Sequence, residues 1–206
     1  MKYDKKRVIQ IVTESAKNYD KFLNNKQFLI IYQTKTGTDY AEVCFREMNY
    51  KHLTGIKSSL TAIQFYEACK DSRLAEDEID IDNEGKVRQK LSVLPYLHAL
   101  LYHNCMIGDF INSGVMIQAD YFVGDTKLVL SVGFRRCKSS YDRPVSLYCG
   151  DVRKMTNPTN KVLVIFKKTI SEDEYKEIAY SSKNLDVSSL NIPAELSVDL
   201  NVLEKK

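Results

Sequence analysis

The spacing of apolar residues changes near residue 104 of this 206-residue chain, and this change limits the folds that the chain can form. Before residue 104, apolar side chains recur every three or four residues, which is the period of an α-helix with one buried face. After it, they form short runs separated by Gly, Asn or Pro, which is typical of β-strands joined by turns. The sequence therefore predicts an α+β fold, with helices and a hairpin first and a small antiparallel sheet after them.

Helices and one hairpin are predicted in the first half of the chain. Ser58 or Ser59 can cap the second helix. Pro95 should kink or divide the third, because proline lacks the amide proton that a helix interior needs. Two β-forming runs flank the turn residues Thr36-Gly37-Thr38 and predict the hairpin. The predicted helices cover 4–23, 60–71 and 86–102, and the hairpin strands cover 27–33 and 40–45.

The second half of the chain predicts an antiparallel meander. Gly124-Asp125 is placed for a tight turn between two of its strands. A helix is expected over 171–180, because acidic residues in its first turn would complement the helix dipole. We expect one domain over 1–180 and a loosely attached tail over 181–206. The predicted strands cover 105–107, 119–123, 128–134, 145–149 and 162–166.

Charge is distributed unevenly along the chain. Between Lys127 and Lys168 there are ten Lys or Arg residues against Asp142 and Asp151, a local balance of +8. The whole chain has a net charge of only +3, so the remainder carries −5. The basic part is compatible with a ligand that carries phosphate, and the alternative is a scattered set of surface lysines.

Several classes of protein are disfavoured by the sequence. The first ten residues are charged and lack the apolar core of a secretory signal. The most apolar stretches, 93–102 and 162–166, are half or less of the ~20 residues that a membrane helix needs. We therefore expect no contact with a membrane and a location in the cytoplasm of the host cell.

No metal or cofactor is predicted. The five cysteines are odd in number and show no C-x-x-C spacing, so we expect reduced thiols and no zinc site. Acidic residues alternate at 78, 80 and 82, but a solvated loop explains them better than a Mg²⁺ site. The glycine-rich nucleotide-binding motifs and the H-E-x-x-H motif do not occur.

His52 has the setting that best suits catalysis. It lies in the polar segment Asn49–Lys57, which we predict to be a loop. An imidazole titrates near neutral pH, so it can exchange the proton of a ribose 2′-hydroxyl or of a departing 5′-oxygen. Lys51, Lys57 or an arginine can then offset charge that builds on the phosphate. The alternative is a histidine satisfied by local hydrogen bonds near a turn.

Seven strings over roughly residues 10–175 resemble a known family when they are taken in order. Together they are similar to the fourth group of phage-encoded barnase/EndoU/colicin/RelE-like nuclease domains. This resemblance implies a small sheet preceded by helices, in a protein that cuts RNA. The strings are HLTGIK (52–57), FYEACKDSRLAEDEI (65–79), KLSVLPYL (90–97), MIGDF (106–110), VGFRR (132–136), DVRKMT (151–156) and VLVIFKK (162–168).

The resemblance also implies which residues form the active site. It makes His52 and Thr54 the leading pair, with Arg73 and Arg153 as phosphate-contacting cations. Arg135 and Arg136 are added on charge alone. The full predicted catalytic set is His52, Thr54, Arg73 and Arg153, and the substrate-binding set is Lys51, Lys57, Arg135, Arg136 and Lys154.

The first functional hypothesis is a metal-independent endoribonuclease. The 2′-oxygen of RNA would attack the adjacent phosphorus and leave a cyclic phosphate, with His52 as general acid or base. The alternative is a non-catalytic phage protein that uses a nuclease-like fold to bind RNA or a host protein. A third hypothesis is a toxin that an antitoxin neutralises. The oligomeric state is left open.

Overall fold

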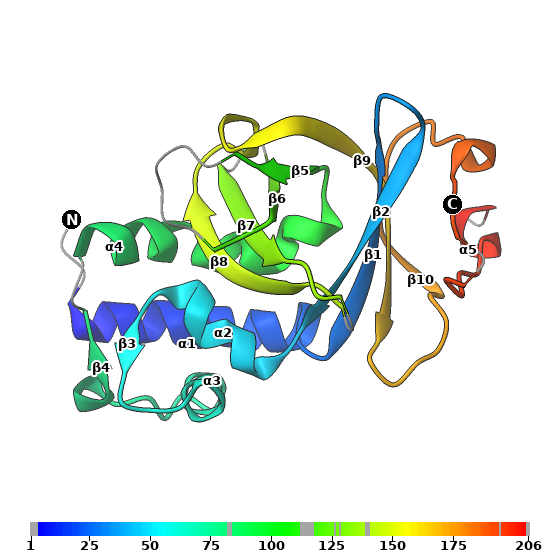
Figure 1. Ribbon diagram of the computed structural model, residues 1–206. Helices are drawn as coiled ribbons and strands as arrows, with labels where there is room; N and C mark the ends of the chain where they lie inside the picture. Colours follow the sequence, from blue (N-terminus) through cyan, green and yellow to red (C-terminus); the bar gives the residue numbers. More distant parts are fainter. Residues whose placement is uncertain are drawn as a thin grey trace.

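The computed structural model describes residues 4–81, 84–111, 118–125, 127, 129–138, 141–193 and 195–204. It combines helices with an antiparallel sheet, which confirms the predicted α+β fold (Figure 1). The α-helices are α1 (Lys5–Phe22), α2 (Glu47–Thr54), α3 (Ala62–Lys70), α4 (Glu84–Val93) and α5 (Asn201–Glu204). The 3₁₀ helices are η1 (Glu76–Glu78), η2 (Leu94–Tyr102), η3 (Val152–Lys154) and η4 (Val187–Ser189). The strands are β1 (Lys26–Gln33), β2 (Thr38–Phe45), β3 (Lys57–Ser58), β4 (Ile79–Asp80), β5 (Met106–Phe110), β6 (Tyr121–Asp125), β7 (Leu130–Arg135), β8 (Arg143–Cys149), β9 (Thr156–Thr169) and β10 (Glu177–Ser181).

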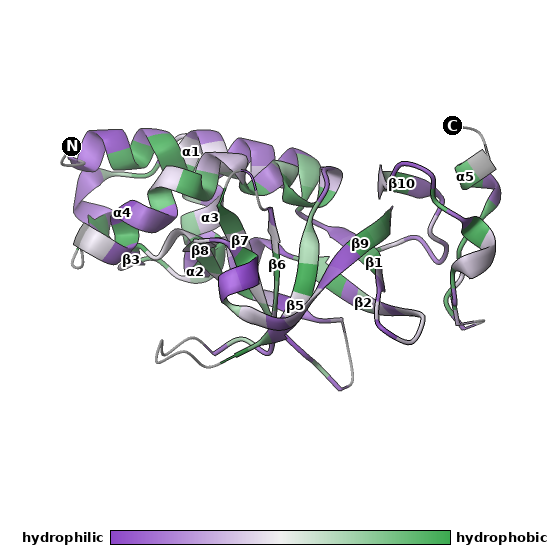
Figure 2. Ribbon diagram, turned by 90° about the horizontal axis from the view of Figure 1, so that it is seen from above, coloured by the Kyte–Doolittle hydropathy of each residue, from purple (hydrophilic) through white to green (hydrophobic). Residues whose placement is uncertain are grey.

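Helix α1 forms because its sequence supplies an N-cap and one apolar face. The Asp4 side chain accepts a hydrogen bond from the backbone amide of Arg7 at 2.7 Å. Polar and apolar residues alternate along the helix (Figure 2). The predicted first helix and the β1–β2 hairpin are therefore confirmed. The buried residues of α1 are Val8, Ile11, Val12, Ser15, Ala16 and Tyr19.

The main sheet is antiparallel and has the strand order β2-β1-β9-β5-β6-β7-β8, with β10 paired to β9. Strands β5 to β8 follow one another in space as in sequence, which confirms the predicted meander. The long strand β9 joins the two halves, because its first part pairs with β5 and its second part with β1 and β10.

The two edges of this sheet meet, so the sheet curls onto itself. Val43 in β2 forms an isolated parallel bridge with Asp142, which lies just before β8. The Cys44 amide donates to the Asp142 carbonyl, and the Asp142 amide donates to the Glu42 carbonyl, each at 2.9 Å. This closure brings β1 and β2 next to the segment between β7 and β8.

The main hydrophobic core lies between the helices and the inner face of the sheet. Figure 1 shows α1 to α4 on one side of the molecule, with the sheet beside them. Aromatic rings join the helices, since the Tyr19 ring centroid is 5.1 Å from that of Tyr50 and 5.9 Å from that of Tyr66. The Tyr50 hydroxyl also donates to the Val12 carbonyl at 2.6 Å, which holds α2 against α1.

The last segment of the chain covers the outer face of the sheet. It packs against a second cluster of buried residues, and Val198 bridges Tyr175. The expectation of a loosely attached tail is therefore corrected, because its widely spaced apolar residues contact a sheet face. A domain boundary near residue 180 stays a prediction. The cluster comprises Leu29, Ile31, Val164, Phe166 and Tyr175, and the segment contributes Leu185, Leu190, Ile192, Leu196, Val198, Val202 and Leu203.

The predicted helix over 171–180 is wrong. Residues 177–181 form strand β10 instead, because β9 is long enough to offer an edge for pairing there. The Glu172 carboxylate accepts hydrogen bonds from the Thr169 amide at 2.7 Å and from its hydroxyl at 2.8 Å. This acid therefore closes a turn and does not complement a helix dipole.

Three local predictions are tested by the remaining elements. Pro95 divides the third predicted helix as expected, since α4 ends at Val93 and η2 continues as a 3₁₀ helix. Thr61, and neither Ser58 nor Ser59, caps α3 by accepting from the Gln64 amide. Gly124-Asp125 belong to β6 and not to a turn. No helix among the described residues is long and apolar enough to cross a bilayer.

Candidate functional site

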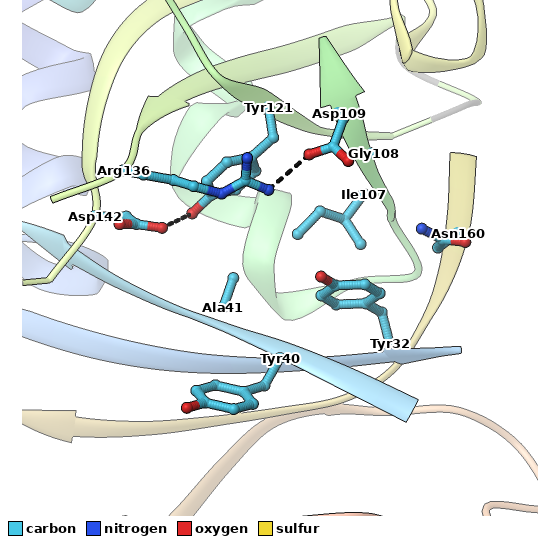
Figure 3. Close-up of a pocket in the computed structure, with 10 residues that line it drawn as sticks. All are labelled: Tyr32, Tyr40, Ala41, Ile107, Gly108, Asp109, Tyr121, Arg136, Asp142 and Asn160. Carbon is cyan, nitrogen blue, oxygen red and sulfur yellow. Dashed lines mark hydrogen bonds and ion pairs between the residues drawn. The ribbon is translucent and has the colours of Figure 1, made fainter. Parts of the chain in front are cut away.

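A small cavity lies where the two halves of the curled sheet meet. Its volume is about 60 Å³, and β1, β2, β5, β6, β9 and the segment between β7 and β8 all contribute to its lining (Figure 3). Because six separate segments converge here, the cavity depends on the closure of the sheet. The lining residues are Tyr32, Tyr40, Ala41, Ile107, Gly108, Asp109, Tyr121, Arg136, Asp142 and Asn160.

Arg136 is the cation of this cavity. Its Nη2 atom is 2.6 Å from Oδ1 of Asp109, and its Cζ atom lies 5.1 Å from the ring centroid of Tyr121. Burial by itself lowers the pKa of Arg136, but the hydrogen bond and charge of Asp109 raise it, and the net shift is upward. The side chain is still 57% exposed, so the guanidinium is a permanent charge that a ligand can reach.

Asp142 anchors the segment that carries Arg136. Its Oδ2 accepts from the Tyr121 hydroxyl at 2.8 Å, and its Oδ1 accepts from the Cys137 amide at 3.0 Å. Burial, and then the Asp142 carboxylate, raise the pKa of Tyr121 well above its usual value, so this phenol stays protonated. Both oxygens of Asp142 are thus engaged in holding the loop against β6.

Tyr32 and Asn160 form the opposite side of the cavity (Figure 3). The Tyr32 hydroxyl donates to Oδ2 of Asp39 at 3.1 Å. Burial, followed by the charge of Asp39, raises the pKa of Tyr32, although the charge of Arg136 opposes this shift. Tyr32 is therefore a neutral hydrogen-bond donor at pH 7, and its hydroxyl is close enough to Arg136 to sense its charge.

Gly108 allows β5 to approach β9 at the cavity. A Cβ atom at this position would lie 2.2 Å from the Pro158 carbonyl oxygen and 2.8 Å from Cβ of Thr156. The first of these contacts is with backbone, so it cannot be relieved by a change of rotamer. Only glycine fits this register without moving a strand.

Gly108→Ala is therefore expected to lower the free energy of unfolding by about 1–3 kcal/mol, the usual cost of overpacking a core. Urea unfolding followed by circular dichroism measures this loss. Gly85→Ala is the matched control, because a Cβ at Gly85 in α4 meets no atom within 4 Å and alanine favours helices. Equal stability of the two variants would show that β5 and β9 can separate at no cost.

The predicted loop around His52 is a helix, so this expectation is corrected. Helix α2 begins where the Arg46 amide donates to Oδ1 of Asn49 at 2.8 Å, and Gly55 ends it with φ of 73°. Leu53 is buried, whereas the His52 side chain is exposed on the outer face of α2. Of the polar residues that suggested a loop, His52 faces solvent, whereas Asn49 and Thr54 are buried and lie toward the two ends of this short helix.

Thr54 and the nearby lysines hold the end of α2. The Thr54 hydroxyl is buried, donates to the Lys51 carbonyl at 2.8 Å and accepts from the Ile56 amide at 3.1 Å. The Lys51 ammonium donates to the Ser58 carbonyl at 3.0 Å and to the Leu60 carbonyl. These contacts hold the α2–β3 connection together.

The predicted arginines lie on separate elements. Arg73 follows α3 and pairs with Asp71 at 2.8 Å, whereas Arg153 lies in η3 and pairs with Asp151 at 2.6 Å. Helix α3 packs on α1 and α2, while η3 packs on β5, β6 and β9. Each pair joins residues two positions apart, so local geometry accounts for both contacts.

Of the predicted site residues, all of which the structure describes, Arg136 alone lines the cavity. The roles of the others stay predictions. Sequence reasoning missed most of the residues around Arg136, although Asp109 lies within the quoted string MIGDF. The predicted site residues outside the cavity are His52, Thr54, Arg73, Arg153, Lys51, Lys57, Arg135 and Lys154. The missed residues are Tyr32, Asp109, Tyr121, Asp142 and Asn160.

The chain matches a model of a known protein family, and the match includes this site. The family model described as phage-Barnase-EndoU-ColicinE5/D-RelE like nuclease4 matches residues 11–184. No curated protein and no solved structure matches the chain. The match includes every strand and every residue that lines the cavity. The chain therefore belongs to the phage-Barnase-EndoU-ColicinE5/D-RelE like nuclease4 family.

Proposed function

We propose that this protein is an endoribonuclease whose reacting centre is the cavity between the two halves of the sheet. The observation that carries the proposal is the placement of Arg136. In a member of a nuclease family, it presents a permanent cation beside a solvent-accessible carboxylate, Asp109, and a neutral phenol, Tyr32. These are the groups that transfer of a phosphodiester requires: a counter-charge, a proton acceptor and a hydrogen-bond donor.

The proposed reaction is attack of the ribose 2′-oxygen on the adjacent phosphorus. Asp109 accepts the 2′-hydroxyl proton as the new P–O bond forms. Arg136 donates hydrogen bonds to the non-bridging oxygens, on which negative charge builds, and Tyr32 turns its hydroxyl proton from Asp39 to one of them. The bond to the 5′-oxygen then breaks, and this oxygen takes a proton from water. The hydroxide that remains takes the proton that Asp109 accepted, which restores the carboxylate. The products are a 2′,3′-cyclic phosphate and a 5′-hydroxyl.

Asp109 suits the role of proton acceptor better than Asp142 does. Asp109 makes its contact with Arg136 through Oδ1 and is 57% exposed, so a substrate can reach its carboxylate. Asp142 already accepts from Tyr121 and from the Cys137 amide. Loss of Asp142 would release the loop that positions Arg136, so its contribution is structural.

Cleavage in the presence of a chelator tests the proposal. The proposed steps use no metal ion, so we expect the protein to cut a single-stranded RNA in excess EDTA and to leave the DNA of the same sequence intact, because DNA lacks the nucleophile. The products are separated by gel electrophoresis, and acid treatment opens the cyclic end. Intact RNA at every protein concentration would reject the proposal. Salt-sensitive retention of RNA without products would favour the alternative, a non-catalytic RNA-binding protein.

A further inference from the structure

A second, more open cavity lies beside the first. Its volume is about 310 Å³, and it is bounded by the end of β2, the start of α2 and the segment that leads into β8. Met48 gives the cavity one apolar side, and this residue is 47% exposed. The lining residues are Cys44, Arg46, Met48, Asn49, Cys137, Tyr141 and Arg143.

Two exposed guanidinium groups set the charge of this second cavity. Within the part of the chain that the structure describes, neither Arg46 nor Arg143 forms an ion pair. Three other arginines, Arg73, Arg136 and Arg153, each contact a carboxylate. Two cations line the second cavity, and none of its lining residues carries a carboxylate. The cavity therefore attracts an anion.

The two cavities lie on opposite sides of one backbone segment. Asp142 lines the first cavity, whereas its neighbours Tyr141 and Arg143 line the second. This arrangement follows from the bridge that Asp142 forms with Val43, because successive side chains of extended backbone point to opposite sides. A chain that leaves the first cavity therefore needs to pass only this segment to reach Arg46 and Arg143.

We propose that the second cavity binds the phosphodiester group one or two nucleotides away from the bond that is cleaved, so that the substrate is single-stranded RNA longer than a dinucleotide. This inference rests on the proposed function. Arg46 and Arg143 hold the phosphate through charge-assisted hydrogen bonds, and Met48 and Tyr141 give the ribose and base an apolar surface. A flexible single strand can bend around the Asp142 segment, whereas a stiff duplex cannot follow it.

Binding of RNA that cannot be cleaved tests this inference separately from catalysis. The probes are fluorescein-labelled 2′-O-methyl oligonucleotides, which lack the attacking hydroxyl: a dinucleotide, a pentanucleotide, and the pentanucleotide in duplex form. Arg46→Ala/Arg143→Ala is expected to bind the single-stranded pentanucleotide about tenfold more weakly than the wild type, and the dinucleotide equally well. The slope of log K against log salt should fall by about 0.7, which corresponds to one lost phosphate contact on a single strand.

Arg7→Ala is the matched control, because Arg7 is exposed and lies 12 residues before Tyr19, whose hydroxyl bonds the Arg46 carbonyl. At 1.5 Å per residue this places it about 18 Å away along α1. Fluorescence anisotropy should show that Arg7→Ala binds the single-stranded pentanucleotide as tightly as the wild type does. Circular dichroism checks the fold of each variant, and Arg46 keeps its backbone contacts in the double variant.

The outcomes separate this inference from the proposed function. Unchanged pentanucleotide binding in the double variant, equal weakening of the dinucleotide, or tighter binding of the duplex would each overturn the inference, even if the wild type cuts RNA. Conversely, a selective loss of pentanucleotide binding would support the second cavity, even if natural RNA stays intact and the proposed reaction is rejected.

Discussion

Replacing Arg136 with alanine is expected to lower the rate of RNA cleavage by about a hundredfold to a thousandfold, as removal of a transition-state donor usually does. The reason is geometric. The guanidinium is fixed by Asp109 at 2.6 Å and by the Tyr121 ring beneath it, so it is already placed when charge develops on the phosphate. Single-turnover cleavage of a fluorescent RNA measures the loss. Arg136→Lys should recover only part of the rate, since lysine keeps the charge but not the planar fork of donors.

Two controls make this experiment decisive. Arg7→Ala removes an exposed arginine of α1 and should cleave like the wild type. His52→Ala tests the site that the sequence alone suggested, on the exposed face of α2. If His52→Ala abolishes cleavage while Arg136→Ala does not, the cavity is not the reacting centre. Thermal unfolding of Arg136→Ala should match the wild type closely, because its exposed ion pair contributes little to stability.

The elements that sequence patterns predicted correctly are those whose signals are local. Helix α1 has an N-cap at Asp4 and a buried face that runs from Val8 to Tyr19, so its period is clear. The β1–β2 hairpin has two β-forming runs around a glycine turn. Pro95 marked the end of α4 because the loss of its amide proton acts within one helical turn.

The errors arose where tertiary contacts decide the structure. Helix α2 has only eight residues, too few to show a clear period, and the burial of Tyr50 and Leu53 stabilises it. Strand β10 forms because β9 offers it an edge, and no local pattern reveals a pairing partner. In both cases packing overrode the local preference of the sequence.

The candidate site illustrates the same difference. The charge pattern predicted Arg136 as a site residue because ten basic residues cluster between 127 and 168. It did not predict Asp109, Tyr121 or Tyr32. These residues are far apart in sequence and come together because the sheet closes at the bridge between Val43 and Asp142. His52 was singled out by its residue type, by its polar segment and by the family resemblance, and none of these says which groups face one another.

The curled sheet therefore links the stability of the core to the geometry of both cavities. Phe45 lies at the end of β2, next to the bridge that closes the sheet, and is 1% exposed. Its ring centroid is 6.1 Å from that of Tyr19 in α1, 5.9 Å from that of Phe28 in β1 and 5.9 Å from that of Phe134 in β7. One side chain thus joins the first helix to both halves of the sheet.

Phe45→Ala is expected to lower the free energy of unfolding by about 3–5 kcal/mol, because it removes a buried ring and leaves a cavity that three rigid elements cannot collapse to fill. This loss is a large share of the roughly 5–15 kcal/mol that a domain has available. Urea unfolding monitored by circular dichroism measures it. Tyr96→Ala is the control, since Tyr96 is an aromatic residue of η2 that is 50% exposed, and it should change stability by less than about 0.5 kcal/mol. A loss below about 1 kcal/mol for Phe45→Ala would mean that the helices and the two halves of the sheet do not share one core.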